Sequence, residues 1–185
     1  MWLLGKSYSG KSALAREMAK ELGIVHLGVK KIIDHFLMNP FDMQAKKLKK
    51  ILRMGGIVPD GLVADLIYKR IQFPDVVKNG YVLTGWPKTM KQAQQLIERN
   101  IVPMSVLCYE IDDWTVKNRA AKFMSARRFK LDQEILEEKL ELDGLNIPMM
   151  EQFFLINYQN FRYLPSSVAI DSNLIKIRIE LKSIL

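Results

Sequence analysis

The sequence is poor in cysteine and contains no long apolar run. Its single cysteine, Cys108, excludes an internal disulfide framework and a zinc site built from several cysteines. No apolar stretch approaches the roughly 18 residues of a membrane-spanning helix. Lys6 and Ser7 also interrupt the N-terminal apolar residues too early for a secretory signal. We therefore expect a cytoplasmic protein with no membrane segment.

Acidic residues are the scarcer charged type, with 20 Asp and Glu against 28 Lys and Arg, and the formal net charge is +8. This excess favours phosphate-bearing partners, whether nucleotides, nucleic acids or acidic membranes, and does not choose among them. The basic run at 46–53 has no interleaved aromatic residue, and no nucleic-acid recognition motif accompanies it. The run therefore indicates a solvated helix face, and nucleic acid is the weakest of the candidate partners.

Short apolar runs alternate with helical patterns along the chain. The apolar runs predict strands at 2–4, 25–27, 81–84, 104–111 and 168–170. Between and after them, the periodicity predicts a helix through Leu14, Met18 and Leu22 that ends at Gly23, helices at about 30–38, 42–54 and 89–99, and helices that begin near residues 60, 113, 132 and 172. Strands that alternate with helices predict an α/β fold with a parallel sheet covered on both faces.

The strongest motif is a glycine-containing loop at residues 5–12, where G-K-S-Y-S-G-K-S fits G-x-x-x-x-G-K-[ST] at every fixed position. It lies between a predicted strand and a predicted helix, which is the structural context of a phosphate-binding loop. Glycines let backbone N–H groups converge on an anion, and the helix N-terminus adds partial positive charge. The alternative is an ordinary strand–helix turn that matches by chance. In the first interpretation the ATP-binding residues are Gly5, Ser7, Tyr8, Ser9, Gly10, Lys11 and Ser12, with Lys11 on the β/γ-phosphates and Ser12 on Mg²⁺.

Further segments carry a family resemblance. Residues 80–89 with Gln92 and Ala93 resemble the G-[FY]-[IL]-L-D-G-[FY]-P-R-[T]-x-x-Q-A signature of adenylate kinases. Residues 55–63 are similar to that family's G-x-[LI]-V-P-D segment, and 169–171 to its closing strand. Order and spacing agree along essentially the whole chain. The sequence is identified as a divergent member of the adenylate kinase, or nucleoside monophosphate (NMP) kinase, family, or as one domain of a multi-domain adenylate kinase.

The resemblance implies a three-layer P-loop NTPase-type fold with a five-stranded parallel sheet. It implies one NMP kinase-like domain over 1–185, with an NMP-binding helical arm at about 28–60 and a short lid at about 125–131. The implied ligands are ATP, Mg²⁺ and an NMP. We expect the isolated domain to be a monomer. The family also contains such domains within larger multi-domain proteins and within flagellar or ciliary proteins. In a protein of the latter kind, the location would be cytoskeletal or ciliary.

The resemblance also implies site residues. Carried over by position, the catalytic residues are Lys11, Lys88, Arg119 and Arg127, of which Arg119 also lies against ATP. The acceptor pocket comprises Val58, Gly85, Lys88 and Gln92. Structural interpretations of the same residues stay open. Gln92 could be an exposed residue of the predicted helix, and Lys88 an ordinary surface lysine. Arg127 and Arg128 could be a solvated charge pair.

The sequence departs from the family pattern at several charged positions. Thr84 replaces an aspartate of the Mg²⁺ shell, Lys88 replaces an arginine, and three further arginine positions hold Asp34, Phe123 and Lys139. Arginine provides a rigid bidentate fork that lysine lacks, and phosphoryl transfer depends on such charge stabilisation. We therefore expect an enzyme that transfers the ATP γ-phosphoryl to an NMP with reduced or altered activity. The alternative is a catalytically inactive domain with a nucleotide-binding or structural role.

Overall fold

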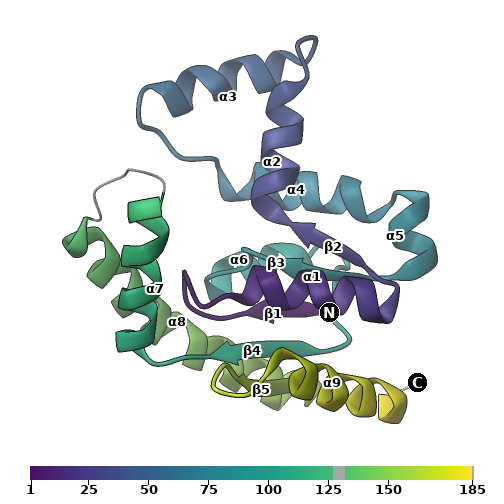
Figure 1. The fold of residues 1–185 in the computed structure, drawn as a ribbon. Coiled ribbons are helices and arrows are strands. Elements are labelled where there is room, and N and C mark those ends of the chain that lie inside the picture. Colours follow the sequence, from purple (N-terminus) through teal and green to yellow (C-terminus); the bar gives the residue numbers. More distant parts are fainter. Residues whose placement is uncertain (127–131, 185) are drawn as a thin grey trace.

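A computed structural model describes residues 1–126 and 132–184, and a five-stranded parallel sheet lies at its centre (Figure 1). The strands are β1 (Trp2–Leu4), β2 (Val25–Gly28), β3 (Tyr81–Thr84), β4 (Val106–Glu110) and β5 (Phe161–Pro165). Their order across the sheet is β2-β3-β1-β4-β5, and every pairing is parallel. The α/β class and the five-stranded parallel sheet expected from the sequence are confirmed.

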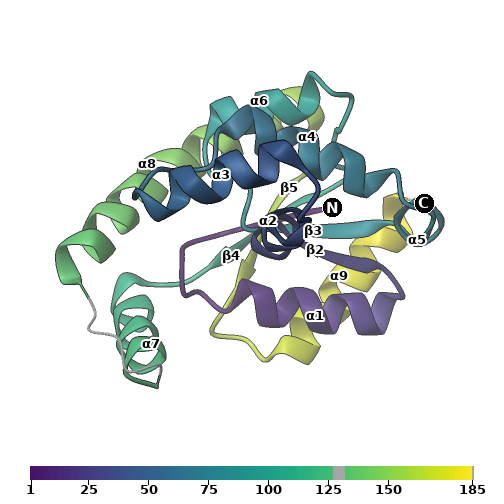
Figure 2. The same cartoon turned by 90° about the horizontal axis from the view of Figure 1, so that it is seen from above.

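Helices cover both faces of this sheet and form three layers with it. They are α1 (Lys11–Leu22), α2 (Val29–Met38), α3 (Met43–Arg53), α4 (Asp60–Ile71), α5 (Pro74–Asn79), α6 (Met90–Ile97), α7 (Asp113–Ala126), α8 (Gln133–Tyr158) and α9 (Ile170–Ile184). Seen from above, α1 and α9 lie on one side of the strands, and α4, α6 and α8 lie on the other (Figure 2). Within the described ranges, no helix combines the length and apolarity that crossing a bilayer requires.

Alternation along the strands creates two separate apolar cores. Trp2 and Leu4 of β1 face the larger core under α4, α6 and α8, whereas Leu3 between them faces the core under α1 and α9. This period of two is the expected geometry of a strand buried on both sides. In the larger core, the rings of Trp2 and Phe154 meet edge to face with centroids 5.5 Å apart. The phosphate loop is thereby attached to a strand that is buried on both faces.

The last strand is not where the sequence predicted it. Residues 168–170 were expected to form a strand, but β5 occupies Phe161–Pro165 and residue 170 begins α9. Phe161 and Leu164 are buried, one in each core, whereas Ala169 is exposed. The prediction was wrong because β5 pairs with β4 and buries Phe161 and Leu164, whereas Ala169 is exposed and Val168 and Ile170 are only half-buried.

The helices α2 and α3 project away from the sheet (Figure 1). α2 leaves the carboxyl end of β2, and α3 lies farther out, where the Asp42 carboxylate caps it by accepting from the backbone N–H groups of Gln44 and Ala45. The basic run at 46–53 lies on α3, and four of its five cations are exposed. The two helices thus form a projection that begins at the carboxyl end of β2 (Figure 1).

Candidate functional site

The glycine loop between β1 and α1 has the backbone geometry of an anion-binding turn. Gly5 has φ 134°, and a Cβ at this position would come within 2.7 Å of the Tyr109 carbonyl oxygen. Gly10 has φ 94° and forms the N-cap of α1. Both values lie in the region that side chains rarely adopt, so glycine is required at both positions. Tyr8, between them, also has a positive φ of 59°.

Lys11 lies at the first turn of α1 and folds back over the loop. Its Nζ donates to the Lys6 carbonyl oxygen at 2.7 Å. Burial lowers the pKa of Lys11 to about 8, while the negative charge of Asp143 opposes that shift and the positive charge of Lys88 adds to it. A partly desolvated ammonium with a nearby second cation gains strongly from an anion, because an added phosphate would neutralise both.

Arg119 braces the same loop from α7. Its guanidinium donates to the Ser9 carbonyl oxygen at 2.5 Å, and its Nη1 would lie 3.2 Å from a Cβ on Gly10. The sequence-based expectation put this arginine against ATP, and the structure brings it to the loop across 110 residues of chain. Arg119 is therefore held beside the phosphate loop, close to Ser9 and Gly10.

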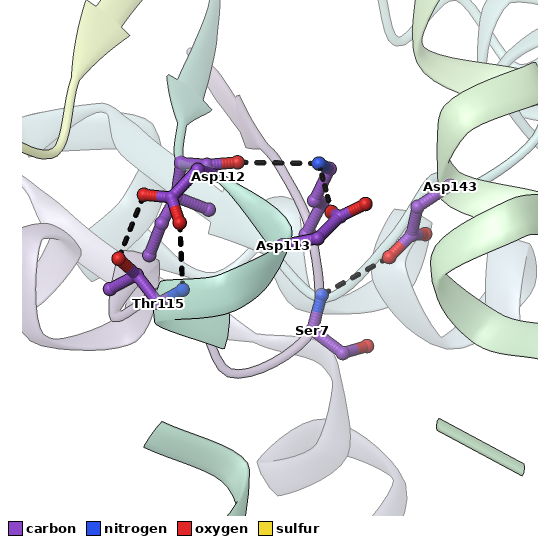
Figure 3. A network of polar contacts seen from close by, with 7 residues as sticks. Ser7, Asp112, Asp113, Thr115 and Asp143 are labelled. Carbon is purple, nitrogen blue, oxygen red and sulfur yellow. Dashed lines mark hydrogen bonds and ion pairs between the residues drawn. The ribbon is translucent and has the colours of Figure 1, made fainter. Parts of the chain in front are cut away.

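An acidic network on the other side of the loop was missed by the sequence analysis (Figure 3). The Ser7 backbone N–H donates to the Asp143 carboxylate of α8 at 3.2 Å. Lys6 pairs with Asp113 at the start of α7 and also donates to the Ile111 carbonyl oxygen. No local pattern marks Asp143 as a partner of Ser7, because the two residues are 136 positions apart.

A cap at the start of α7 keeps this network in place. The Asp112 carboxylate accepts from the backbone N–H and from the hydroxyl of Thr115, both at 2.7 Å (Figure 3). These hydrogen bonds lower the pKa of Asp112. A carboxylate that accepts from an early helix N–H is a normal N-cap, so Asp112 serves to fix the helix rather than to bind a ligand.

Oxygen donors for a divalent cation are few around the loop. Ser12 is exposed at the start of α1, and the Ser9 hydroxyl is buried with no hydrogen-bond partner. In the described part of the chain, no group of three or more His, Cys, Asp or Glu side chains could hold a metal ion by itself. These residues fit a cation that is held mainly by phosphate oxygens and needs few protein ligands, as Mg²⁺ with ATP does.

The second half of the site begins where β3 ends. Thr84 is buried, and its hydroxyl lies 2.8 Å from Nε2 of His26 on the neighbouring strand. Burial, with the positive charges of Lys31 and Arg16, lowers the pKa of His26, which keeps the ring neutral near pH 7. Thr84, the last residue of β3, is the member of this pair that stands where the family pattern has an aspartate.

The turn after β3 holds Gln92 by both ends of its side chain. Its Oε1 accepts from the Lys88 backbone N–H at 2.7 Å, and its Nε2 donates to the Asp60 carboxylate at 2.9 Å. Gln92 therefore joins the turn to the N-terminus of α4. Gly85, in the same turn, is exposed with φ 87°, and the Lys88 side chain is also exposed. Val58 packs partly against the larger core beside this turn.

The substituted positions have distinct surroundings. Asp34 is exposed on α2, and Lys139 is exposed on α8. Phe123 of α7 meets the Tyr8 ring of the phosphate loop edge to face, with centroids 5.6 Å apart. Phe123 thus stands near the position where the family pattern has an arginine, and Tyr8 where it has a small residue. Arg127 and the rest of the expected lid from residue 127 to residue 131 lie outside the described residues.

Comparisons with known proteins find similarity to adenylate kinases. A family model described as adenylate kinase matches residues 3–180. Adenylate kinase 2 of Schistosoma mansoni is 31% identical over 138 residues, which cover 75% of this chain and 50% of that protein. The adenylate kinase of Treponema pallidum is 35% identical over 101 residues, 55% of this chain and 46% of that protein. That of Thermotoga petrophila is 28% identical over 137 residues, with 74% and 54% covered. The chain spans about half the length of these curated relatives.

Proposed function

The chain belongs to the adenylate kinase family, and from this premise we propose that it binds ATP at the phosphate loop and transfers the γ-phosphoryl group to an NMP. The observation that carries the proposal is the loop itself. Gly5 and Gly10 hold the strained backbone of an anion-binding turn, and Lys11 lies over it with a lowered pKa. A matching motif without this geometry would be an ordinary turn.

On the donor side, Lys11 would contact the β/γ-phosphates and Arg119 would add charge at the loop entrance. The residues expected to line the phosphates are those of the loop: Gly5, Ser7, Tyr8, Ser9, Gly10 and Ser12. Ser12 would be a ligand of Mg²⁺, which when bound neutralises charge on the phosphate oxygens. Phosphoryl transfer to an NMP needs no general base, since the acceptor phosphate is already a nucleophile.

On the acceptor side, Lys88 and the backbone of Gly85 and Val58 would face the NMP, with Gln92 selecting the base. Gln92 donates to the Asp60 carboxylate and accepts from the Lys88 backbone N–H, and these two hydrogen bonds support a fixed orientation of its amide. The projecting helices within 28–60 would form the NMP-binding arm. Residues 125–131, including Arg127 as a phosphate clamp, would form the lid.

We further propose that turnover is slow. Thr84 has a hydroxyl that is hydrogen-bonded to His26, at the position where the family's aspartate would order the Mg²⁺ shell. Asp34 has a negative charge at the position where the family's arginine would attract the acceptor phosphate. Loss of one transition-state arginine costs about 10³–10⁵ in rate where it acts as a finger. Several such losses are not additive, since these groups act as a unit.

A second candidate is a domain that binds nucleotide without catalysing transfer, within a larger protein. The observation that favours it is the Asp143 carboxylate hydrogen-bonded to the Ser7 N–H, which puts negative charge on the phosphate loop. The edge-to-face contact of Phe123 with Tyr8 adds to this, because an aromatic pair supplies no charge to a transition state.

A radiolabel transfer experiment separates the two candidates. We would incubate the protein with γ-³²P-labelled ATP, Mg²⁺ and, in turn, AMP, CMP, UMP and GMP, and separate the products by thin-layer chromatography. Label in one nucleoside diphosphate would establish the kinase and name its acceptor. Retention of label in ATP with every acceptor, although ATP binds, would overturn the kinase proposal in favour of the binding domain.

A further inference from the structure

A cavity of about 400 Å³ lies between β2, α2 and α4. None of the described residues that line it belongs to the phosphate loop or to the turn at 84–92. Its volume falls within the range of about 300–1,000 Å³ that is usual for small-molecule sites. The cavity is therefore large enough for a ligand. It is lined in part by α2 of the expected NMP-binding arm, and it is separate from the phosphate loop and from the turn at 84–92.

The walls of the cavity are mainly apolar. Two helices supply facing side chains, and β2 supplies the floor; the apolar lining residues are Leu27, Ile32, Phe36, Leu66 and Phe73. Phe73 is more than half exposed, at 55%. An aromatic side chain left in water beside a concave apolar wall favours a ligand with an apolar body, because contact with it removes that surface from water.

The rim of the cavity is basic. Five basic side chains line the cavity, namely His26, Lys31, His35, Lys69 and Arg70, and no carboxylate occurs among its described lining residues. The guanidinium of Arg70 is held by two hydrogen bonds to Asp75, of 2.8 and 2.6 Å, and lies 5.1 Å from the centre of the Phe73 ring. Arg70 is thus neutralised by its neighbour.

Lys31 and Lys69 differ from Arg70 in this respect. Both are exposed, they come from opposite walls on α2 and α4, and neither has a hydrogen bond or ion pair with another described residue. Their charge is not balanced within the cavity. An anion between the two walls would interact with both ammonium groups, which attract it over several ångströms even in water.

We propose that this cavity binds a small organic anion with an apolar body and one phosphate or carboxylate head. The apolar side chains of α2 and α4 contact the body, and Lys31 and Lys69 pair with the head at the rim. His26 lines the cavity and also hydrogen-bonds to Thr84, so a ligand here lies one side chain away from the carboxyl edge of the sheet. The proposal does not depend on the kinase activity.

An NMR titration tests the site with four defined probes. Octyl phosphate and octanoate combine an apolar body with the two kinds of head, while 1-octanol lacks the charge and inorganic phosphate lacks the body. We expect saturable shifts of backbone amide resonances in α2 and α4 with octyl phosphate, octanoate or both, and no saturation with the two incomplete probes. The comparison of the two anionic probes identifies the preferred head. Absence of saturable shifts with both anionic probes would overturn the proposal.

Charge reversal gives the matched control. The Lys31→Glu/Lys69→Glu variant should weaken binding of the anionic probe about tenfold or more, since two attractive charges become repulsive. The Lys46→Glu/Lys50→Glu variant makes the same change in net charge on exposed positions of α3 outside the cavity, and its affinity should stay within a factor of two of that of the unmodified protein. Equal loss in both variants would contradict the site. If the first variant failed to fold, Lys31→Gln and Lys69→Gln singly would test the same contacts.

Discussion

The Ser7 backbone N–H donates to the Asp143 carboxylate at 3.2 Å, and this contact puts the negative charge of α8 directly on the phosphate loop (Figure 3). The same carboxylate raises the pKa of Lys11, against the larger lowering by burial. Asp143 therefore interacts with two groups that a phosphate would need. A bound triphosphate and this carboxylate would compete for the same N–H and the same ammonium.

Asp143→Asn should accordingly tighten ATP binding. A unit charge about 4 Å away contributes roughly 1–4 kcal/mol at effective dielectric constants of 80 to 20, so we expect about a tenfold lower Kd. Isothermal titration calorimetry with Mg²⁺–ATP at low salt would measure it. Glu141→Gln, which removes a charge from an exposed position of the same helix, is the control. Unchanged or weaker binding in Asp143→Asn would show that the carboxylate does not compete.

The pKa of Lys11 predicts how ATP affinity varies with pH. Its value of about 8 in the fold is below the ordinary 10.5, so in the nucleotide-free protein Lys11 loses its proton as the pH rises through about 8. ATP affinity should then fall as the pH rises above about 8. Lys11→Arg, which stays protonated throughout this range, should give a flatter profile. Parallel profiles for the two proteins would contradict this prediction.

The lowered pKa of Lys11 has the opposite effect on stability: ATP affinity should fall as the pH rises, whereas the free energy of unfolding should increase. Between about pH 8 and pH 10.5 the unfolded chain binds a proton at Lys11 that the fold does not. The Lys11 contribution to the free energy of unfolding therefore increases with pH in this range. Urea unfolding of the unmodified protein and of Lys11→Arg at both ends of the range would measure the difference.

Asp34→Arg should improve use of the acceptor. Asp34 is exposed on α2 at a position where the family pattern has an arginine, and an arginine pairs with a phosphate through two parallel hydrogen bonds. We expect the KM for the NMP to fall about tenfold, or kcat to rise by a similar factor, in a steady-state assay. Glu17→Arg makes the same charge change at an exposed position of α1. An equal gain in that variant would indicate a general electrostatic effect.

Phe154→Ala should strongly destabilise the fold. Phe154 is fully buried in the larger core and contacts Trp2 of the strand that carries the phosphate loop. Truncation of a buried phenylalanine costs about 3–5 kcal/mol. Urea unfolding would measure this loss. Ile156, on the same helix, is 70% exposed, and Ile156→Ala should change the free energy of unfolding by less than about 0.5 kcal/mol. Similar losses in the two variants would contradict the assigned core.

The sequence predicted the parts of the fold that depend on local pattern. The phosphate loop is recognisable because glycines at fixed spacing between a strand and a helix are needed for its backbone, and φ values at Gly5 and Gly10 agree with that requirement. β1, β3 and β4 are apolar runs that contribute to both cores, so their composition is distinctive, and β2 packs Val25 and Leu27 against the larger core. In these segments the local signal and the tertiary environment coincide.

Features that depend on distant contacts were not predictable. β5 contains exposed Arg162 and ends at Pro165, so it lacks a strand-like composition, and its place is fixed by pairing with β4. α5 has only six residues, too few to show a period. Asp143 reaches Ser7 across 136 positions, and the tie between Gln92 and Asp60 joins two helices. Tertiary packing alone creates these relationships.

Phosphorus NMR of ATP, Mg²⁺ and an NMP, followed in parallel for the unmodified protein and Lys11→Ala, tests the proposed kinase activity most directly. We predict slow appearance of nucleoside diphosphate resonances with at least one acceptor, and their loss in Lys11→Ala, since the Lys11 ammonium is the group proposed to contact the β/γ-phosphates. Spectra that stay unchanged for every acceptor, or the same rate in Lys11→Ala, would contradict the account.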